Sequence, residues 1–116
     1  MVLYRPVNRA ELDLIAASNF KAFPPRLPEQ PIFYPVLNES YAEQITVEWN
    51  VPTYGEGYVL KFEVADSFIA KYQVQTVGAD DHTELWIPAE DLPALNANII
   101  GHITVVSSFP KEASAN

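Results

Sequence analysis

Apolar and polar positions alternate most regularly in the segment from Tyr58 to Val64. All its even positions are apolar, whereas Lys61 and Glu63 occupy odd positions, a pattern typical of a strand with one buried face. Shorter runs rich in β-branched and aromatic residues predict further strands over residues 2–5, 32–36, 72–77, 83–87 and 99–107. In the last of these, Gly101 is expected at a bend or a bulge.

Helical periodicity fills the longer intervals between these strands. Asn8 is expected to cap a helix over residues 9–18, and Asn19 to end it in the left-handed conformation. Asn38 is expected to cap a second helix that begins at Glu39. The apolar face of this second helix is predicted from the spacing of Tyr41, Ala42, Ile45 and Trp49.

Two shorter helices complete the secondary structure. Asp66 is expected to cap a helix over residues 67–70, and Pro88 suits the first turn of another. Residues 50–57, with one proline and two glycines, are predicted to form a loop. The elements together predict an α+β fold, in which small antiparallel-rich sheets and short helices surround a cleft.

Four prolines lie between Phe23 and Pro31. They exclude a helix and a central strand, so this segment is predicted to be a stiff, extended loop. The loop is either a plain connector or the rigid wall of a pocket, into which Arg26 would point. In the second case the prolines would hold Arg26 in place at little entropic cost.

Composition narrows the class of protein. The 116 residues predict a single domain over residues 1–109, followed by a flexible tail over residues 110–116. With no cysteine and two isolated histidines, no metal site is expected. The net charge of −8 argues against nucleic-acid binding through a basic face. Since there is neither a signal peptide nor an apolar run of membrane-spanning length, we expect a cytoplasmic protein with no membrane association.

Tyr34 is predicted at the end of a strand that leads directly into the helix capped by Asn38. Free amides at a helix N-terminus attract anions, so this edge suits a phosphate-bearing ligand. The alternative is a strand and a helix that simply pack together.

The order of the motifs resembles the ADP-ribosyltransferase fold, including its small bacterial and toxin-like members. It also looks like a small bacterial family labelled with ADP-ribosylation and crystallin J1. The resemblance covers most of the chain and rests on short motifs: a first strand ending in Arg5, the segment around Tyr34, Asn38–Ala42, Val59–Val64, Glu84–Pro88 and Ile99–Val105.

This resemblance implies an NAD-binding, mono-ADP-ribosyltransferase-like enzyme. In that family three strands each contribute one residue to the cofactor cleft, and the matching positions here are Arg5, Tyr34 and Glu84. Arg5 would grip the cofactor, Tyr34 would offer a ring face to nicotinamide, and Glu84 would stabilise positive charge that develops on the ribose. NAD or ADP-ribose would then be the small-molecule partner.

Further cofactor contacts are expected from Arg26, Asn38 and His82, of which His82 stands where one branch of the family carries an acid or amide. The same residues also allow a second interpretation. A non-catalytic interaction or regulatory domain could keep the scaffold alone, with Arg5 paired to an acid and Glu84 a solvated strand residue. Convergence of Arg5, Tyr34 and Glu84 on one cleft would favour the enzyme.

Overall fold

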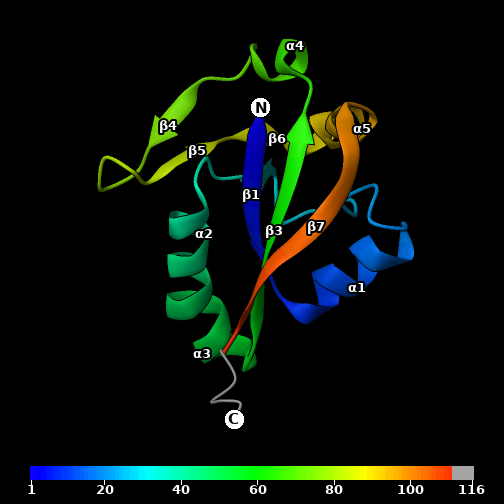
Figure 1. Ribbon diagram of the computed structural model, residues 1–116. Coiled ribbons are helices and arrows are strands. Elements are labelled where there is room, and N and C mark those ends of the chain that lie inside the picture. Colours follow the sequence, from blue (N-terminus) through cyan, green and yellow to red (C-terminus); the bar gives the residue numbers. More distant parts are fainter. Residues whose placement is uncertain (111–116) are drawn as a thin grey trace.

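The computed structural model describes residues 1–110, and its centre is a three-stranded antiparallel sheet (Figure 1). The strands are ordered β1 (Val2–Val7), β3 (Gly57–Val64) and β7 (Ile99–Phe109). Two small antiparallel pairs accompany this sheet, and they consist of β2 (Ile32–Phe33) with β6 (Ile87–Pro88), and β4 (Val74–Thr76) with β5 (Thr83–Leu85). The α+β class with small antiparallel sheets is therefore confirmed.

Short helices lie on both sides of the central sheet, with α1 and α2 on opposite sides (Figure 1). In chain order they are α1 (Arg9–Ala17), α2 (Glu39–Ile45), the π-helical turn η1 (Thr46–Asn50), α3 (Val51–Tyr54), α4 (Asp66–Ile69), the 3-10 turn η2 (Ala89–Asp91) and α5 (Leu92–Ala97). None of the helices within residues 1–110 is long and apolar enough to cross a membrane.

A short segment centred on Val36 joins the central sheet to the β4–β5 pair. Val36 bridges Tyr4 of β1 on one side and Glu84 of β5 on the other, both in antiparallel sense. On the β5 side the hydrogen bonds run from the Leu37 amide to the Thr83 carbonyl and from the Leu85 amide to the Pro35 carbonyl. The Val36 amide donates to the Tyr4 carbonyl at 2.8 Å, and the Tyr4 amide donates back at 2.9 Å. This row therefore sets the side of the sheet to which each neighbouring residue points.

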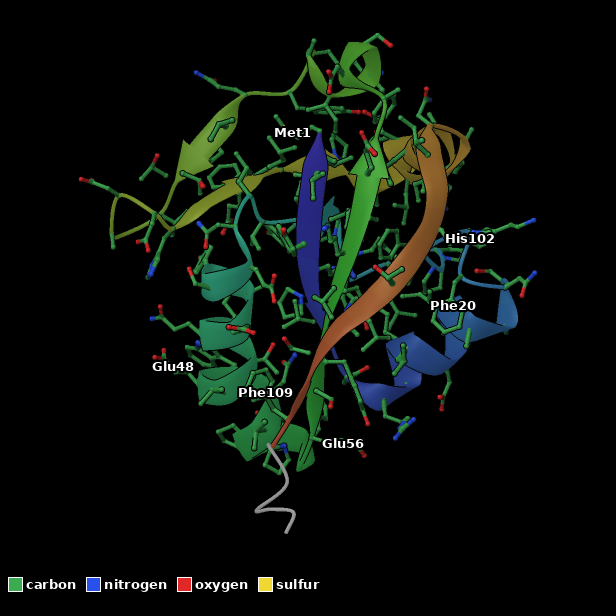
Figure 2. All side chains as sticks on the ribbon, in the orientation of Figure 1. Met1, Phe20, Glu48, Glu56, His102 and Phe109 are labelled. Atoms are coloured by element: carbon green, nitrogen blue, oxygen red, sulfur yellow. The ribbon has the colours of Figure 1, made fainter. Side chains whose placement is uncertain are left out.

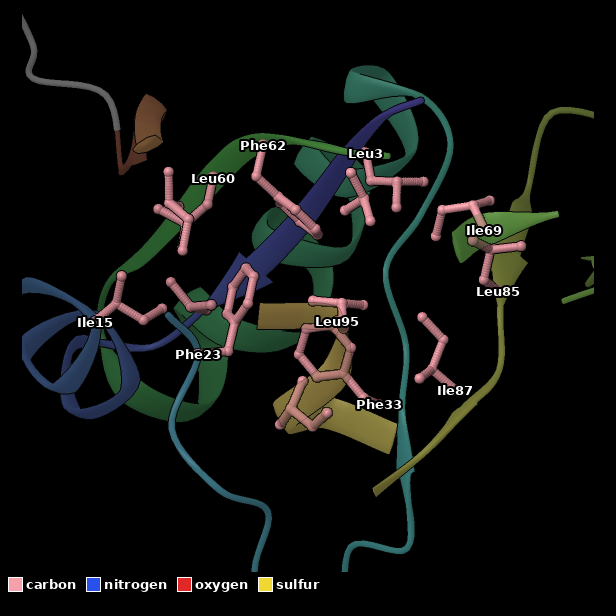
Figure 3. Packing of buried hydrophobic residues seen from close by; sticks show 14 of the residues in the cluster. Leu3, Ile15, Phe23, Phe33, Leu60, Phe62, Ile69, Leu85, Ile87 and Leu95 are labelled. Carbon is pink, nitrogen blue, oxygen red and sulfur yellow. The ribbon is translucent and has the colours of Figure 1, made fainter. Parts of the chain in front are cut away.

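The main core lies on the face of the sheet that α1 and α5 cover (Figure 3). The Phe23 ring stands nearly edge-on to Phe62, with centroids 4.7 Å apart, and it also contacts Phe33 at 5.0 Å. The predicted alternation of β3 is confirmed, because Leu60, Phe62 and Val64 are buried here while Lys61 and Glu63 are exposed. Val59 instead packs on the opposite face, beneath α2.

Local signals for helix ends are largely confirmed. The side chains of Asn8 and Asn38 cap α1 and α2 by accepting from the amides three residues ahead. Asn19 ends α1 with a positive φ of 65°. Gly101 also has a positive φ, and it lies at a shift in the β3–β7 register, as expected for a bulge. By contrast, the side chain of Asp66 does not cap α4 and instead pairs with the N-terminal amine.

The helix that begins at Glu39 runs further than the sequence pattern predicts. The π-helical turn η1 inserts extra chain per turn, and the helix continues as α3 until Gly55 ends it with a φ of 82°. The predicted loop over residues 50–57 is therefore wrong. So is the placement of Trp49 on the buried face: the wider turn puts Thr46 inside and leaves Trp49 69% exposed.

The predicted strand over residues 83–87 is interrupted at Trp86. Its first part pairs with β4, and its second part turns to pair with β2. Leu85 and Ile87 are both buried on the same core face, so the alternation holds across the break. The last residues of the predicted tail, from residue 111 onward, lie outside the described residues.

Truncation of Phe62 tests the predicted burial. The Phe62 ring is 2% exposed and packs against Phe23, so we expect Phe62→Ala to lower the free energy of unfolding by about 3–5 kcal/mol. The neighbouring Glu63→Ala, at an exposed position, should change stability by less than about 0.5 kcal/mol. Urea denaturation measures both, and equal effects would show that the strand is out of register.

A second stability test concerns the contact between β3 and η1. A Cβ atom at Gly57 would lie 2.6 Å from the Thr46 methyl and 2.9 Å from the Asn50 Cβ. Gly57→Ala should therefore destabilise the fold by about 1–3 kcal/mol through overpacking. Thr46→Ser removes that methyl but keeps the hydroxyl that donates to Ala42, so the double variant should recover part of the loss. If the double variant lost as much stability in thermal unfolding as the two single variants together, this contact would be contradicted.

Candidate functional site

Two arginines meet over the ring of Phe33. The Arg5 guanidinium lies 4.5 Å from the ring centroid, and that of Arg26 lies 5.9 Å from it. Arg5 comes from β1 and is only 8% exposed. It forms a bidentate pair with Glu11 of α1, in which Nε donates at 2.6 Å and Nη2 at 3.0 Å. The charge of Arg5 is therefore matched by one partner.

The guanidinium of Arg26 has fewer hydrogen-bond partners than that of Arg5. Its Nη2 donates to the Ile32 carbonyl at 3.1 Å, but its buried Nε has no hydrogen-bond partner among the described residues. Burial lowers the pKa of Arg26 below its usual value, and the nearby charge of Arg5 lowers it further, while Glu11 and Tyr34 act in the opposite direction. The protein thus holds a partly buried cation whose charge the neighbouring groups compensate incompletely.

Arg26 borders a hollow of about 410 Å³ between the proline loop and α5, which is a volume typical of small-molecule sites. The side chain of Asn96 holds the loop in place, because it accepts from the Phe23 amide at 2.9 Å and donates to the Phe23 carbonyl at 3.0 Å. The remaining lining is mainly apolar and consists of Phe23, Pro25, Ala89, Glu90, Leu92 and Pro93. A smaller hollow of about 200 Å³, lined in part by Glu11, also borders Pro25 and Arg26.

Tyr34 lies beside the two arginines. Its carbonyl accepts from Arg5 Nη1 at 3.4 Å, and its phenol is close enough to influence the pKa of Arg26. Tyr34 as a whole residue is 43% exposed. Three of the predicted site residues, Arg5, Arg26 and Tyr34, are therefore neighbours.

The other predicted site residues form a separate cluster. Glu84 accepts hydrogen bonds from the Tyr41 hydroxyl at 3.2 Å and from the Trp86 indole at 2.7 Å. The His82 ring stacks on Tyr41 with centroids 4.3 Å apart. Asn38, which caps α2, donates through its side-chain amide to the Asp81 carbonyl.

The two clusters lie on opposite faces of the sheet. Directly paired residues of antiparallel strands share a face, and neighbours along a strand alternate. Tyr4, Val36 and Glu84 form one such row. Arg5 follows Tyr4 and so points to the other side, where it contacts Phe33 and Glu11. Arg5 and Glu84 therefore do not converge on one cleft.

Sequence reasoning missed several residues that complete these clusters. Glu11 stands at capping-box spacing from Asn8, but its carboxylate pairs with Arg5 instead. Trp86 is on the same strand face as Glu84, at two residues' distance, and this spacing could have identified it. The pairing of Tyr41 with Glu84 spans 43 residues, and no local pattern indicates it.

Comparison of the sequence with protein-family models found no match, and comparisons with curated proteins and with solved structures found none either. Within residues 1–110, no group of three or more histidines and carboxylates is arranged to hold a metal ion. The geometry of the two clusters is therefore the basis on which a function is proposed.

Removal of Glu11 tests the pairing with Arg5. Glu11→Ala leaves Arg5 buried without its anion, so we expect a loss of about 3 kcal/mol in the free energy of unfolding. Asp13→Ala removes the same charge from the same helix, but Asp13 is exposed and lies 4.0 Å from an exposed Arg9. This control should lose less than about 0.5 kcal/mol. Similar urea midpoints for both variants would refute a structural role for the buried pair.

Proposed function

We propose that the hollow between the proline loop and α5 binds a small organic anion with an apolar body, and that Arg26 is its anchor. The observation that carries this proposal is the incomplete satisfaction of Arg26, whose buried Nε lacks a partner within the described chain. Buried polar groups are normally hydrogen-bonded. A carboxylate or phosphate of a ligand in the hollow that Arg26 borders would supply the missing negative charge.

The surrounding charges support an anionic ligand. Both oxygens of Glu11 accept hydrogen bonds from Arg5, so Glu11 acts on Arg26 only as a nearby negative charge. Burial lowers the pKa of Arg26, and the nearby charge of Arg5 lowers it further, so the two arginines disfavour each other electrostatically. An anion next to Arg26 would offset the repulsion between the two arginines.

The walls of the hollow define the rest of the ligand. Phe23, Leu92 and two prolines offer apolar surface to a flat or aliphatic body. Glu90 lies on the same lining and is exposed. It would repel a second anionic group and attract a hydrogen-bond donor or a cationic part of the ligand.

NAD and ADP-ribose belong to this ligand class, and the resemblance to the ADP-ribosyltransferase fold makes them natural first ligands to test. Binding is better supported than transfer, because Glu84 lies on the opposite face from Arg26 and its neighbours. A catalytic role of Glu84 stays a prediction that rests on the resemblance. Glu84→Gln in a nicotinamide-release assay tests it, and a drop in turnover of ~10²-fold or more would support it.

Calorimetry with phenyl phosphate, benzoate, ADP-ribose and NAD tests the anion site. We expect at least one of these anions to bind, and the neutral benzyl alcohol to bind at least about tenfold more weakly. Arg26→Gln should weaken the anion by about 10- to 100-fold, because a hydrogen bond to a charged group contributes ~1.5–3 kcal/mol.

Arg9→Gln is the matched control, since it removes the same charge from an exposed arginine that pairs with Asp13 and Glu56. Its effect on affinity should be less than about twofold. If Arg9→Gln and Arg26→Gln lost the same affinity for the anion, the loss would come from the change in net charge alone, and the proposal would be overturned. Absence of binding by every anion at millimolar concentration would overturn it as well.

A further inference from the structure

The cluster around Glu84 is a carboxylate framed by aromatic rings. Trp86 donates its indole N–H to one oxygen at 2.7 Å, and Tyr41 donates its hydroxyl to the other at 3.2 Å. His82 lies flat against Tyr41, with an angle of 7° between the rings, and its Nε2 is 3.2 Å from the Gln44 side-chain oxygen. Both oxygens of Glu84 are thus held in fixed directions by neutral donors.

No cation neutralises Glu84 within residues 1–110. The ion pairs of this part of the chain involve other carboxylates, and the nearest ionisable base of the cluster, His82, approaches Asp81 at 3.8 Å instead. Hydrogen bonds from a phenol and an indole orient the carboxylate but leave its full negative charge in place. The negative charge is therefore available to a cation from outside the molecule.

The aromatic rings select the kind of cation. Trp86 is 47% exposed, and the face of an indole is the most favourable of the aromatic surfaces for a cation. A hard metal ion needs several oxygen ligands, whereas this cluster offers one carboxylate whose oxygens are already engaged. A soft, partly apolar organic cation gains from both the rings and the carboxylate.

We propose that Glu84, Trp86 and Tyr41 form a binding site for an alkylammonium group, such as a quaternary amine or the side chain of a lysine. The ammonium group lies against the exposed Trp86 indole and next to the Glu84 carboxylate, and the stacked pair of Tyr41 and His82 forms the adjoining side. The net charge of −8 favours the approach of cations over long range. This site is independent of the anion pocket at Arg26, because it lies on the other face of the sheet.

Two matched pairs of probes test the proposal by NMR. Choline is compared with its neutral isostere 3,3-dimethyl-1-butanol. Nα-acetyl-lysine amide, whose side-chain ammonium is free, is compared with the neutral Nα-acetyl-norleucine amide. The readout is the indole N–H signal of Trp86, assigned with Trp86→Phe. We expect both cationic probes to shift this signal in a saturable way, and both neutral probes to leave it within about a tenth of that shift.

Trp49 serves as an internal control, since it is 69% exposed and lies on η1. The indole N–H signal of Trp49 should not shift as the cationic probes are added. Glu84→Gln keeps an acceptor for the Trp86 indole but removes the charge, so the affinity for both cations should fall at least about tenfold. Glu48→Gln removes the same charge from the outer side of the helix that includes η1 (Figure 2), and it should change affinity by less than about twofold.

The probes also separate the possible sources of the ammonium group. Saturation by choline alone assigns the site to small quaternary amines, and saturation by the lysine amide extends it to protein side chains. The proposal is overturned if the neutral isosteres shift Trp86 as much as the cations do. It is equally overturned if Trp49 shifts in parallel, or if Glu84→Gln binds as tightly as the unaltered protein while its other amide signals show an intact fold.

Discussion

The pairing of Val36 with Tyr4 and Glu84 is the constraint on which the rest of the structure depends. It ties the β4–β5 pair to the central sheet through one short row of backbone hydrogen bonds. Because side chains alternate along each strand, this row also decides which face receives each polar group. A shift by one residue would exchange the faces of all three strands. The placement of Arg5 and Glu84 follows from this register.

As a result, the two faces carry groups of opposite charge. On the face of the main core, Arg5 and Arg26 share the ring of Phe33, with Glu11 as the partner of Arg5. On the face of α2, Glu84 is surrounded by neutral aromatic donors. Each face thus holds one group whose charge is incompletely matched, and the sheet keeps the two apart.

The stiffness of the proline loop helps to hold Arg26 in place on the face of the main core. The proline loop has few conformations to lose, and Asn96 fixes its start by a pair of hydrogen bonds to Phe23. Phe23 in turn packs into the core between Phe33 and Phe62. Arg26, three residues further on, is therefore held near Phe33 without a dedicated salt bridge. Core packing and the proposed anion site therefore use the same segment.

Features that depend on a few neighbouring residues were determined by the sequence itself. The alternation in β3, the caps at Asn8 and Asn38, and the bulge at Gly101 all follow from local side-chain size, hydrogen bonding or backbone freedom. The proline loop belongs to the same group, since the rigidity of its segment is a property of its residues alone.

The tertiary structure alone decided how these elements combine. Residues 34, 36 and 84 look equivalent in an alternating pattern, but the bridges of Val36 to Tyr4 and to Glu84, which are distant in the sequence, assign the faces of Val36 and Glu84. The π-helical turn at Thr46 arises where the helix must pack against Gly57, and it turns Trp49 outward. The Glu11 carboxylate pairs with Arg5 because a buried guanidinium needs an anion. Strand pairing and burial of this kind depend on the folded chain and leave no local pattern in the amino-acid sequence.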